Sequence, residues 1–323
     1  MVTRRQMIAI GIGAAAAVGG VGVNLTYHRD MRQIRTAIAE QPTKTIQTRH
    51  GGMEYAETGT GPPFLIIHGT GGGFDQGLLF AGGLAGAGMR VIAPSRFGYL
   101  GSDMPDDPSS QNQADALVDL LDALQIEQIA ICGGSAGALS ALQFAIRHPN
   151  RCAALFPLVP ATYAPDRPPA RPWSPAQTRI AQAVLGSDFL FWSAIKAMPD
   201  TLMRTLLATD PALVAAASAP EQARAKAIMQ DILPVSAKSR GLLNDARLAG
   251  NPAQMALHQI TAPTLAISAE DDLFLTADAA RHIADQVPLA RLKIYSEGGH
   301  IYIGHGDDML AEIVRFLNDI EYL

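Results

Sequence analysis

The chain has 323 residues, enough to bury a large core in one domain with insertions or in two domains. Its formal net charge is −5 and it has no basic block, which argues against a nucleic-acid partner. Cys132 and Cys152 are the only two cysteines, and both stand in apolar segments. We therefore expect two buried thiols rather than a disulfide. The sequence contains no C-x-x-C or H-E-x-x-H spacing typical of a metal site.

Residues 1–27 contain two arginines, Arg4 and Arg5, followed by an apolar stretch that carries no charge from Gln6 to Tyr27. The part from Met7 to Leu25 is long enough to cross a bilayer, so we predict a membrane anchor in a hydrophobic N-terminal helix. The alternative is an export signal, because TRRQMI at 3–8 resembles a twin-arginine motif and VGG at 18–20 is a weak cleavage site. Arginines flank both ends of the segment, which leaves its orientation open.

Residues 28–44 are predicted to be a linker, with a short amphipathic helix or linker at Arg29–Glu40 that ends before Pro42. From residue 45 to 323 the chain alternates between short apolar runs and helical patterns. Runs that are apolar throughout are typical of strands buried on both faces of a sheet. The expected strands are Thr45–Arg49, Met53–Thr58, Phe64–Ile67, Arg90–Ala93, Gln128–Cys132, Cys152–Leu158, Thr264–Ile267 and Leu292–Tyr295.

Helical spacing of apolar residues predicts helices at Ser110–Leu124, Ala136–Arg147 and Asp308–Leu317, the first capped by Ser109 or Ser110. From 161 to about 252 a proline-rich loop gives way to helical stretches without a strand pattern, which indicates a helical insertion. Strands that alternate with helices predict an α/β fold with a mostly parallel central sheet and helices on both faces.

Ser135 stands in GGSAG at 133–137, which fits G-x-S-x-G directly between an expected strand and an expected helix. Glycines on both sides leave room for the sharp turn that exposes a nucleophilic serine. A serine hydroxyl is a poor nucleophile near neutral pH and needs a base, an acid that orients the base, and donors for the oxyanion. A plain strand–helix turn is the alternative interpretation of this motif.

The base and the acid are expected behind the last two strands of the sheet. His300 follows Leu292–Tyr295 in the sequence SEGGH, and His305 is the alternative base. Glu270, Asp271 and Asp272 follow Thr264–Ile267, and their adjacency leaves the choice of acid open. The order Ser, acid, His is complete, and each member lies at the carboxyl end of an expected strand, where open α/β sheets place their sites.

From Thr45 to the end, the chain resembles the α/β-hydrolase superfamily. The matching segments are HGTGGG at 68–73, SRFGYLGS at 95–102, GGSAG at 133–137, EDD at 270–272 and GGH at 298–300. In this family the acid often stands in G-x-x-D-x-x-x-P. Here the pattern falls on Ala269, Asp272 and Thr276, which favours Asp272 over Asp271 and leaves Asp271 as a loop carboxylate facing solvent.

The resemblance implies an oxyanion hole formed by the backbone N–H of Ala136 and that of Thr70 or its neighbour Gly71. It also implies that the insertion at 161–252 is a helical cap over an apolar pocket. Family members with an aspartate nucleophile are excluded by Ser135.

We therefore predict a serine hydrolase, a carboxylesterase or lipase-like enzyme that cleaves a small or medium apolar ester. Its catalytic residues are Ser135, His300 and Asp272, and no cofactor or metal is needed. One rival uses the same residues on another bond, as a C–C hydrolase, a proline-releasing aminopeptidase or a cofactor-free peroxidase. The other rival is a catalytically idle binding module tethered to a membrane. The oligomeric state is left open.

Overall fold

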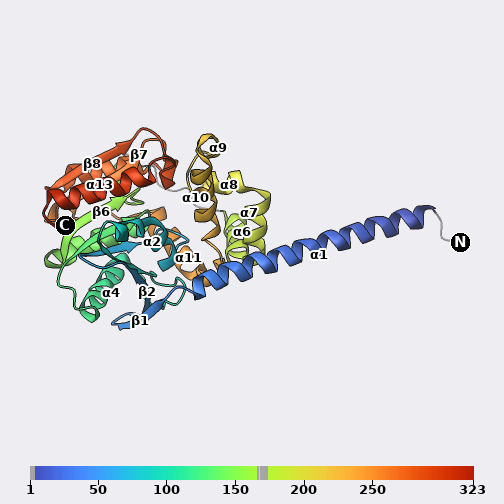
Figure 1. Ribbon diagram of the computed structural model, residues 1–323, viewed down its shortest axis with the longest axis horizontal. Coiled ribbons are helices and arrows are strands. Elements are labelled where there is room, and N and C mark those ends of the chain that lie inside the picture. The colour runs from blue at the N-terminus through green and yellow to red at the C-terminus, as the bar shows by residue number, and fades with distance from the viewer. Residues whose placement is uncertain (1–3, 166, 168–173) are drawn as a thin grey trace. The chain divides into compact units, whose positions relative to one another are not determined.

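The computed structural model describes residues 4–165, 167 and 174–323, and for 4–21 and Gln177 it describes the backbone only. The chain divides into two compact units, Met1–Gln41 and Pro42–Leu323 (Figure 1). The first unit consists of the helix α1 (Arg4–Ala39), so the segment at 28–39 continues this helix. The predicted anchor lies largely in residues whose side chains fall outside the description, and it stays a prediction. Among the residues that the structure describes, no helix is both long and apolar enough to cross a membrane.

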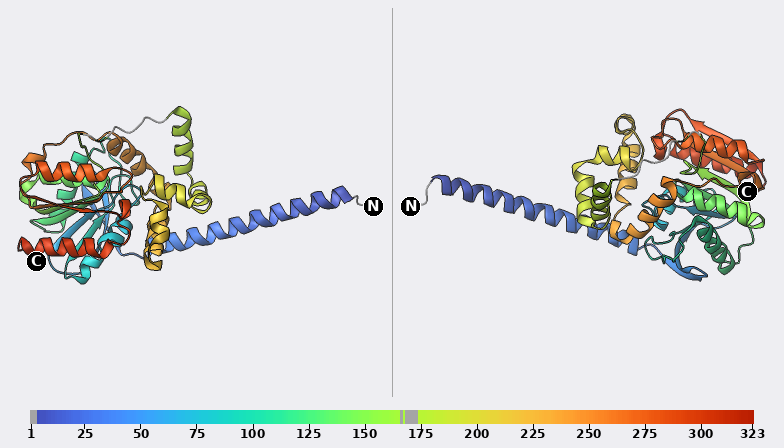
Figure 2. Two further views of the ribbon diagram at one scale, coloured as in Figure 1. Left: turned by 90° about the horizontal axis from the view of Figure 1, so that it is seen from above. Right: turned by 180° about the vertical axis from the view of Figure 1, so that it is seen from behind.

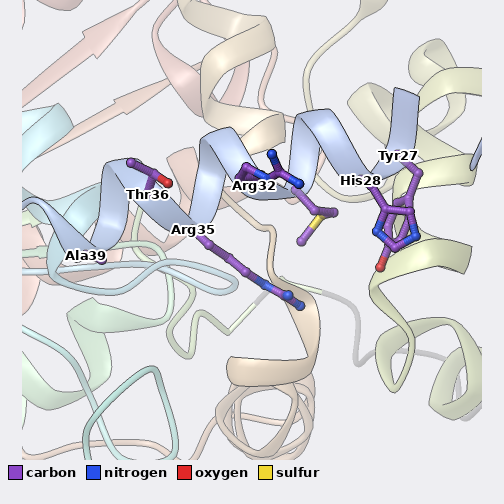
Figure 3. Close-up of a pocket in the computed structure, with 7 residues that line it drawn as sticks. Tyr27, His28, Arg32, Arg35, Thr36 and Ala39 are labelled. Atoms are coloured by element: carbon purple, nitrogen blue, oxygen red, sulfur yellow. The ribbon is translucent and has the colours of Figure 1, made fainter. Parts of the chain in front are cut away.

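One face of α1 is drawn in Figure 3, where Tyr27, His28, Arg32 and Arg35 follow one another along the helix. Together with Met31, Thr36 and Ala39 they line a hollow, and their spacing of three and four residues puts them on one side of the helix. None of them belongs to the segments that carry the predicted catalytic residues.

The second unit is built on a single sheet of eight strands, in the order β1-β2-β4-β3-β5-β6-β7-β8 (Figure 1). β1 and β2 pair with their neighbours in antiparallel fashion, and the other pairs are parallel. The strands are β1 (Thr43–Thr48), β2 (Gly51–Thr58), β3 (Pro63–Ile67), β4 (Arg90–Pro94), β5 (Ile129–Gly134), β6 (Cys152–Leu158), β7 (Thr264–Ala269) and β8 (Ala290–Tyr295). The predicted α/β architecture with a mostly parallel sheet is therefore confirmed.

The strand order reverses at β3, and this reversal decides where a site can lie. The chain passes from β3 to β4 on one side and then returns to β5 on the other side of β3. The loops that follow β3 and β5 therefore leave the sheet in opposite directions and open a crevice between them. HGTGGG at 68–73 and Ser135 are in these two loops.

Helices cover both faces of the sheet, as two views of the ribbon show (Figure 2). They are α2 (Phe74–Ala81), α3 (Gly83–Gly86), α4 (Ser110–Ala123), α5 (Gly137–Arg147), α12 (Thr276–Gln286) and α13 (Gly306–Asp319), with 3₁₀ turns η1 (Pro149–Arg151), η3 (Leu257–Gln259) and η4 (Gly299–Ile301). Ser109 is the residue that caps α4, because its side chain accepts a hydrogen bond from Asn112 N–H.

Alternate residues of β3 face opposite sides of the sheet, as the pleat requires. Leu65 and Ile67 pack into the main apolar cluster together with residues of α4, α5 and α12. On the other face, Phe64 lies 5.7 Å from Phe156 and Phe156 lies 5.5 Å from Phe316 of α13, measured between ring centroids. The central strands are thus buried on both faces, which explains why they read as continuous apolar runs. Cys132 in β5 and Cys152 in β6 are buried free thiols, as predicted.

Between β6 and β7 the described residues form helices and no strand, and they gather on one side of the sheet (Figures 1 and 2). We call this segment the cap. It contains α6 (Pro175–Leu185), α7 (Asp188–Ala197), α8 (Pro199–Thr205), α9 (Pro211–Ala216), α10 (Ala219–Gln230), η2 (Val235–Ala237) and α11 (Ser239–Gly250). Part of the proline-rich loop that was predicted to begin this insertion, 166 and 168–173, lies outside the described residues.

Candidate active site

Ser135 stands at the junction of β5 and α5 with a φ of +51°, a left-handed conformation that is strained for a residue other than glycine. The turn is held by its own backbone, because Ser135 N–H donates to Leu158 O at 2.9 Å. Its glycines are needed for space. A Cβ at Gly133 would lie 2.7 Å from Gly137 O, and one at Gly137 would lie 2.5 Å from Ile67 O. This is the geometry of a nucleophile elbow.

The loop after β3 runs directly beside this turn, since a Cβ added to Gly69 would lie 3.2 Å from the Cβ of Ser135. Among the described residues, the N–H groups of Thr70 and Ala136 donate no hydrogen bond, as donors for an oxyanion require. The N–H of Gly71, the alternative donor, is bonded to Tyr99 Oη at 3.3 Å. The structure therefore leaves Thr70 and Ala136 as the available pair.

His300 and Asp272 lie together, although 28 residues separate them in the chain. His300 Nδ1 is 2.7 Å from Asp272 Oδ2, and both side chains are buried. Asp272 also accepts hydrogen bonds from Phe274 N–H at 2.8 Å and from the Thr276 hydroxyl. Burial alone would raise the pKa of Asp272, but the His300 ring and these donors outweigh it and lower the pKa below its ordinary value. The carboxylate is thus ionised at neutral pH.

Asp271 differs from its expected role as a loop carboxylate facing solvent. It accepts hydrogen bonds from the backbone N–H of Gly299 at 2.8 Å and of Gly298 at 3.2 Å. Both glycines have positive φ, so the loop makes a turn that the carboxylate ties to the end of β7. Asp271 therefore supports the backbone that leads to His300, whereas Asp272 contacts the ring.

Thr209 is a cap residue that sequence reasoning missed. Its Oγ1 accepts the backbone N–H of His300 at 3.1 Å, and its hydroxyl donates to Leu207 O at 2.8 Å. The ring of Phe274 meets the His300 ring edge-on, with centroids 5.2 Å apart. A lone threonine in a helical insertion carries no local signal of this role, because the contact joins segments 91 residues apart.

The alternative base, His305, lies elsewhere. Its ring stacks on Tyr295 with centroids 4.4 Å apart, and it has no hydrogen bond to Asp272 among the described residues. Ser135 and His300 make no hydrogen bond with one another in the described part of the chain. Such contacts are often long in an enzyme without substrate and tighten when the reacting complex forms.

The family model for the alpha/beta hydrolase fold matches residues 62–305. This range includes Ser135, Asp272 and His300, and the chain belongs to the alpha/beta hydrolase family. One relative matches this chain over nearly the whole length of the relative. It is the 2-hydroxy-6-oxononadienedioate/2-hydroxy-6-oxononatrienedioate hydrolase of Paraburkholderia xenovorans. It is 29% identical over 300 residues, which cover 87% of this chain and 98% of the relative.

Two solved structures share the fold. An alpha/beta hydrolase fold protein from Nakamurella multipartita superposes with a TM-score of 0.67 at 25% identity, over 85% of this chain and 99% of the other. A membrane phospholipase A superposes with a TM-score of 0.64 at 20% identity, over 99% of each chain. The fold similarity to the second protein therefore extends over almost the entire chain.

Proposed function

We propose that the protein is a serine hydrolase that cleaves small or medium apolar esters, with Ser135 as nucleophile, His300 as base and Asp272 as acid. One observation carries the proposal. A serine in left-handed conformation stands next to two N–H groups that have no bond among the described residues, and a buried His–Asp pair follows strands of the same sheet. These are the parts that acyl transfer through a serine needs. The left-handed φ of Ser135 supports the proposal because it occurs at the strand–helix junction where a nucleophile elbow needs it.

The reaction follows from these roles. Ser135 Oγ attacks the ester carbonyl while His300 Nε2 takes its proton, and the N–H groups of Thr70 and Ala136 stabilise the oxyanion. Asp272 holds the proton on His300 Nδ1 and stabilises the imidazolium. His300 then protonates the leaving alcohol. It next activates a water that attacks the acyl-enzyme, and the acid and free Ser135 are released.

We call the loop at 68–73, which carries the N–H of Thr70, the oxyanion loop. Its surroundings favour an apolar, uncharged acyl group. Ile232 of the cap lies against Gly71, whose added Cβ would be 3.2 Å from Ile232 Cγ1. Phe274 contributes an aromatic ring beside His300. The buried guanidinium next to this loop, Arg96, is already paired with Asp245 and is not available to a substrate carboxylate. Apolar contacts of this kind suit an acyl chain.

A second candidate is cleavage of a C–C bond in an anionic vinylogous diketone. The Paraburkholderia relative is named as a hydrolase of hydroxy-oxo dicarboxylates, which are also anionic. Arg167 favours this second candidate, because the half-buried cation interacts electrostatically with the carboxylates of Asp272 and Asp278. Burial lowers the pKa of Arg167, and the two carboxylates oppose that shift. Its Nη1 donates to Thr162 O at 2.8 Å, so the cation has a fixed place from which it can attract an anionic substrate.

A labelling experiment tests the nucleophile. The wild-type protein should react covalently with a fluorophosphonate, and Ser135→Ala should not. Ser140→Ala changes a buried serine on α5, the helix that follows Ser135, and as the matched control it should label like the wild type. An unlabelled wild type would refute the proposed serine hydrolase activity, and a labelled Ser135→Ala would show that another residue is the nucleophile.

A substrate panel then separates the two candidates. p-Nitrophenyl esters of increasing acyl length, dipeptide amides and a vinylogous diketone carboxylate are compared by kcat/KM. Faster turnover of esters supports the proposal, whereas faster turnover of the diketone supports the second candidate. In that second case Arg167→Gln should lower kcat/KM for the diketone by a larger factor than for the neutral esters.

We propose further that the N-terminal segment attaches the protein to a membrane. The apolar stretch at 7–25 supports this, as does the match of a membrane phospholipase A over nearly the whole chain. The rival is export directed by the twin-arginine-like motif. Full-length protein with an intact N-terminus in the membrane fraction supports the anchor, and a shortened soluble form supports export.

A further inference from the structure

A buried ion pair joins the cap to the loop that follows strand β4. Arg96, which follows β4, donates from Nη1 and Nη2 to the two carboxylate oxygens of Asp245 at 2.7 and 2.5 Å. Asp245 is on α11 of the cap, 149 residues further along the chain, and its side chain is 1% exposed. Two charges are removed from water only where the geometry compensates them, as this bidentate pair does. The reaction outlined above does not use either residue.

Both members of the pair are linked to the oxyanion loop, Arg96 directly and Asp245 through Tyr99. Tyr99 Oη donates to Asp245 Oδ2 at 2.5 Å and accepts the N–H of Gly71 at 3.3 Å. Arg96 Nη2 also donates to Gly69 O at 3.1 Å. The loop is therefore held immediately before and immediately after Thr70.

The contact at Gly69 O acts directly on the Thr70 N–H. The carbonyl of Gly69 and the N–H of Thr70 belong to one planar trans peptide unit and point in opposite directions. Fixing the carbonyl on one side therefore aims the N–H on the other. His68 Nδ1 also hydrogen-bonds to the Gly69 carbonyl, at 2.7 Å, and His68 Nε2 accepts the N–H of Arg96 at 2.9 Å. The two contacts place the ring proton on Nδ1.

The protonation states suit this arrangement. Burial, followed by the charge of Arg96, lowers the pKa of His68 well below its usual value, so the ring is neutral and can accept at Nε2. Burial and Asp245 raise the pKa of Tyr99, which keeps its hydroxyl proton for Asp245. A cation on the carbonyl of a peptide also strengthens the N–H of the same peptide as a donor.

We propose that Asp245 is a positioning residue of the cap that aims the oxyanion-hole N–H of Thr70 through Arg96 and Tyr99. The proposal rests on the serine hydrolase function proposed above. It means that a docked cap and a competent oxyanion hole are one structural unit, so that the site becomes fully active only when α11 is in place.

The first test compares an ester with its thionoester, in which sulfur replaces the carbonyl oxygen and accepts N–H bonds weakly. Tyr99→Phe keeps the ring and removes only the hydroxyl. We expect it to lower kcat/KM for the ester by about tenfold, less than the 10²–10³ typical of losing a donor outright, and to lower the thionoester much less. The ester-to-thionoester ratio therefore falls. Equal losses on both substrates would overturn the proposal, because a general structural defect affects both alike.

The second test needs no substrate. Amide hydrogen exchange at 69–73 should be faster in Tyr99→Phe and in Asp245→Asn than in the wild type. Asn244→Ala is the matched control, because this neighbour on α11 also ties the cap to the loop before α4, by a bond to Pro108 O, without contacting the oxyanion loop. Exchange at 69–73 should be unchanged in it. Unchanged exchange in Tyr99→Phe refutes the inference even where Asp245→Asn fails to fold.

The two hypotheses fail separately. A wild type that hydrolyses neither substrate refutes the proposed function, and exchange then decides the loop contact alone. A wild type that is active while both Tyr99→Phe and Asp245→Asn keep the substrate ratio refutes only the role of Asp245.

Discussion

Asp272→Asn is the substitution that distinguishes most sharply between the adjacent carboxylates. The wild-type carboxylate accepts three hydrogens, from Phe274 N–H, the Thr276 hydroxyl and His300 Nδ1. An asparagine has one oxygen and one NH₂, so either Oδ1, which faces Phe274 N–H, or Oδ2, which faces Thr276 and His300, is replaced by a donor. The backbone N–H of Phe274 cannot change its role. The hydroxyl can turn toward Ser268, which already lies 2.9 Å from it, and the imidazole can shift its proton.

The asparagine NH₂ should therefore face His300 and hold the ring with its proton on Nε2. That tautomer cannot take a proton from Ser135, and the corresponding change in a serine protease lowers kcat by about 10⁴. A factor of this size corresponds to about 5 kcal/mol of transition-state stabilisation. Folding should be nearly intact, because the substitution preserves the shape of the side chain.

Asp271→Asn is the matched control. It keeps an oxygen that can accept one of the two glycine N–H groups, so we expect kcat to fall by about tenfold at most, the cost of one weakened hydrogen bond. The assay is kcat and KM on a p-nitrophenyl ester, with active sites counted by fluorophosphonate labelling. A loss in Asp271→Asn as large as that in Asp272→Asn would refute the assignment of the acid.

Three further outcomes are expected. Burial, together with a neighbouring carboxylate, raises the pKa of Asp231 to about 6, so its ionisation opposes folding. The stability present below pH 4 is lost as pH rises through 6, and Asp231→Asn should stabilise the protein by about 1–2 kcal/mol above pH 7 but not at pH 4. Denaturant unfolding at both pH values measures this, and an equal effect at the two would contradict it. Gly137→Ala would put its Cβ 2.5 Å from Ile67 O and should cost about 2–4 kcal/mol, visible as a lower midpoint of thermal unfolding. Burial raises the pKa of both Cys132 and Cys152, so a thiol reagent should modify them only after denaturation, and rapid reaction of the native protein would contradict this.

Two helices, α2 and α12, were not predicted from the sequence because their local signals are weak. The pattern of α2 is weakened by Gly77, a poor helix former that is required because its Cβ would lie 2.9 Å from that of Ala93 in β4. α12 begins after Leu275, which has a left-handed φ of +56° and no capping side chain, so the usual start signal is missing. In both cases tertiary packing outweighs local preference.

Local patterns were sufficient for the strands, the elbow at Ser135 and the order of Ser, acid and His, because strands buried on both faces must be apolar throughout and their carboxyl ends meet at one edge. The resemblance favoured Asp272 over Asp271, but the two are neighbours in the chain, and only the tertiary structure shows that the Asp272 side chain points to His300. It also shows that the N–H of Gly71 is bonded to Tyr99, whereas that of Thr70 has no bond among the residues described. That difference depends on Tyr99 and on Asp245, a single acidic residue in a helical insertion, and contacts across such distances leave no pattern in the sequence.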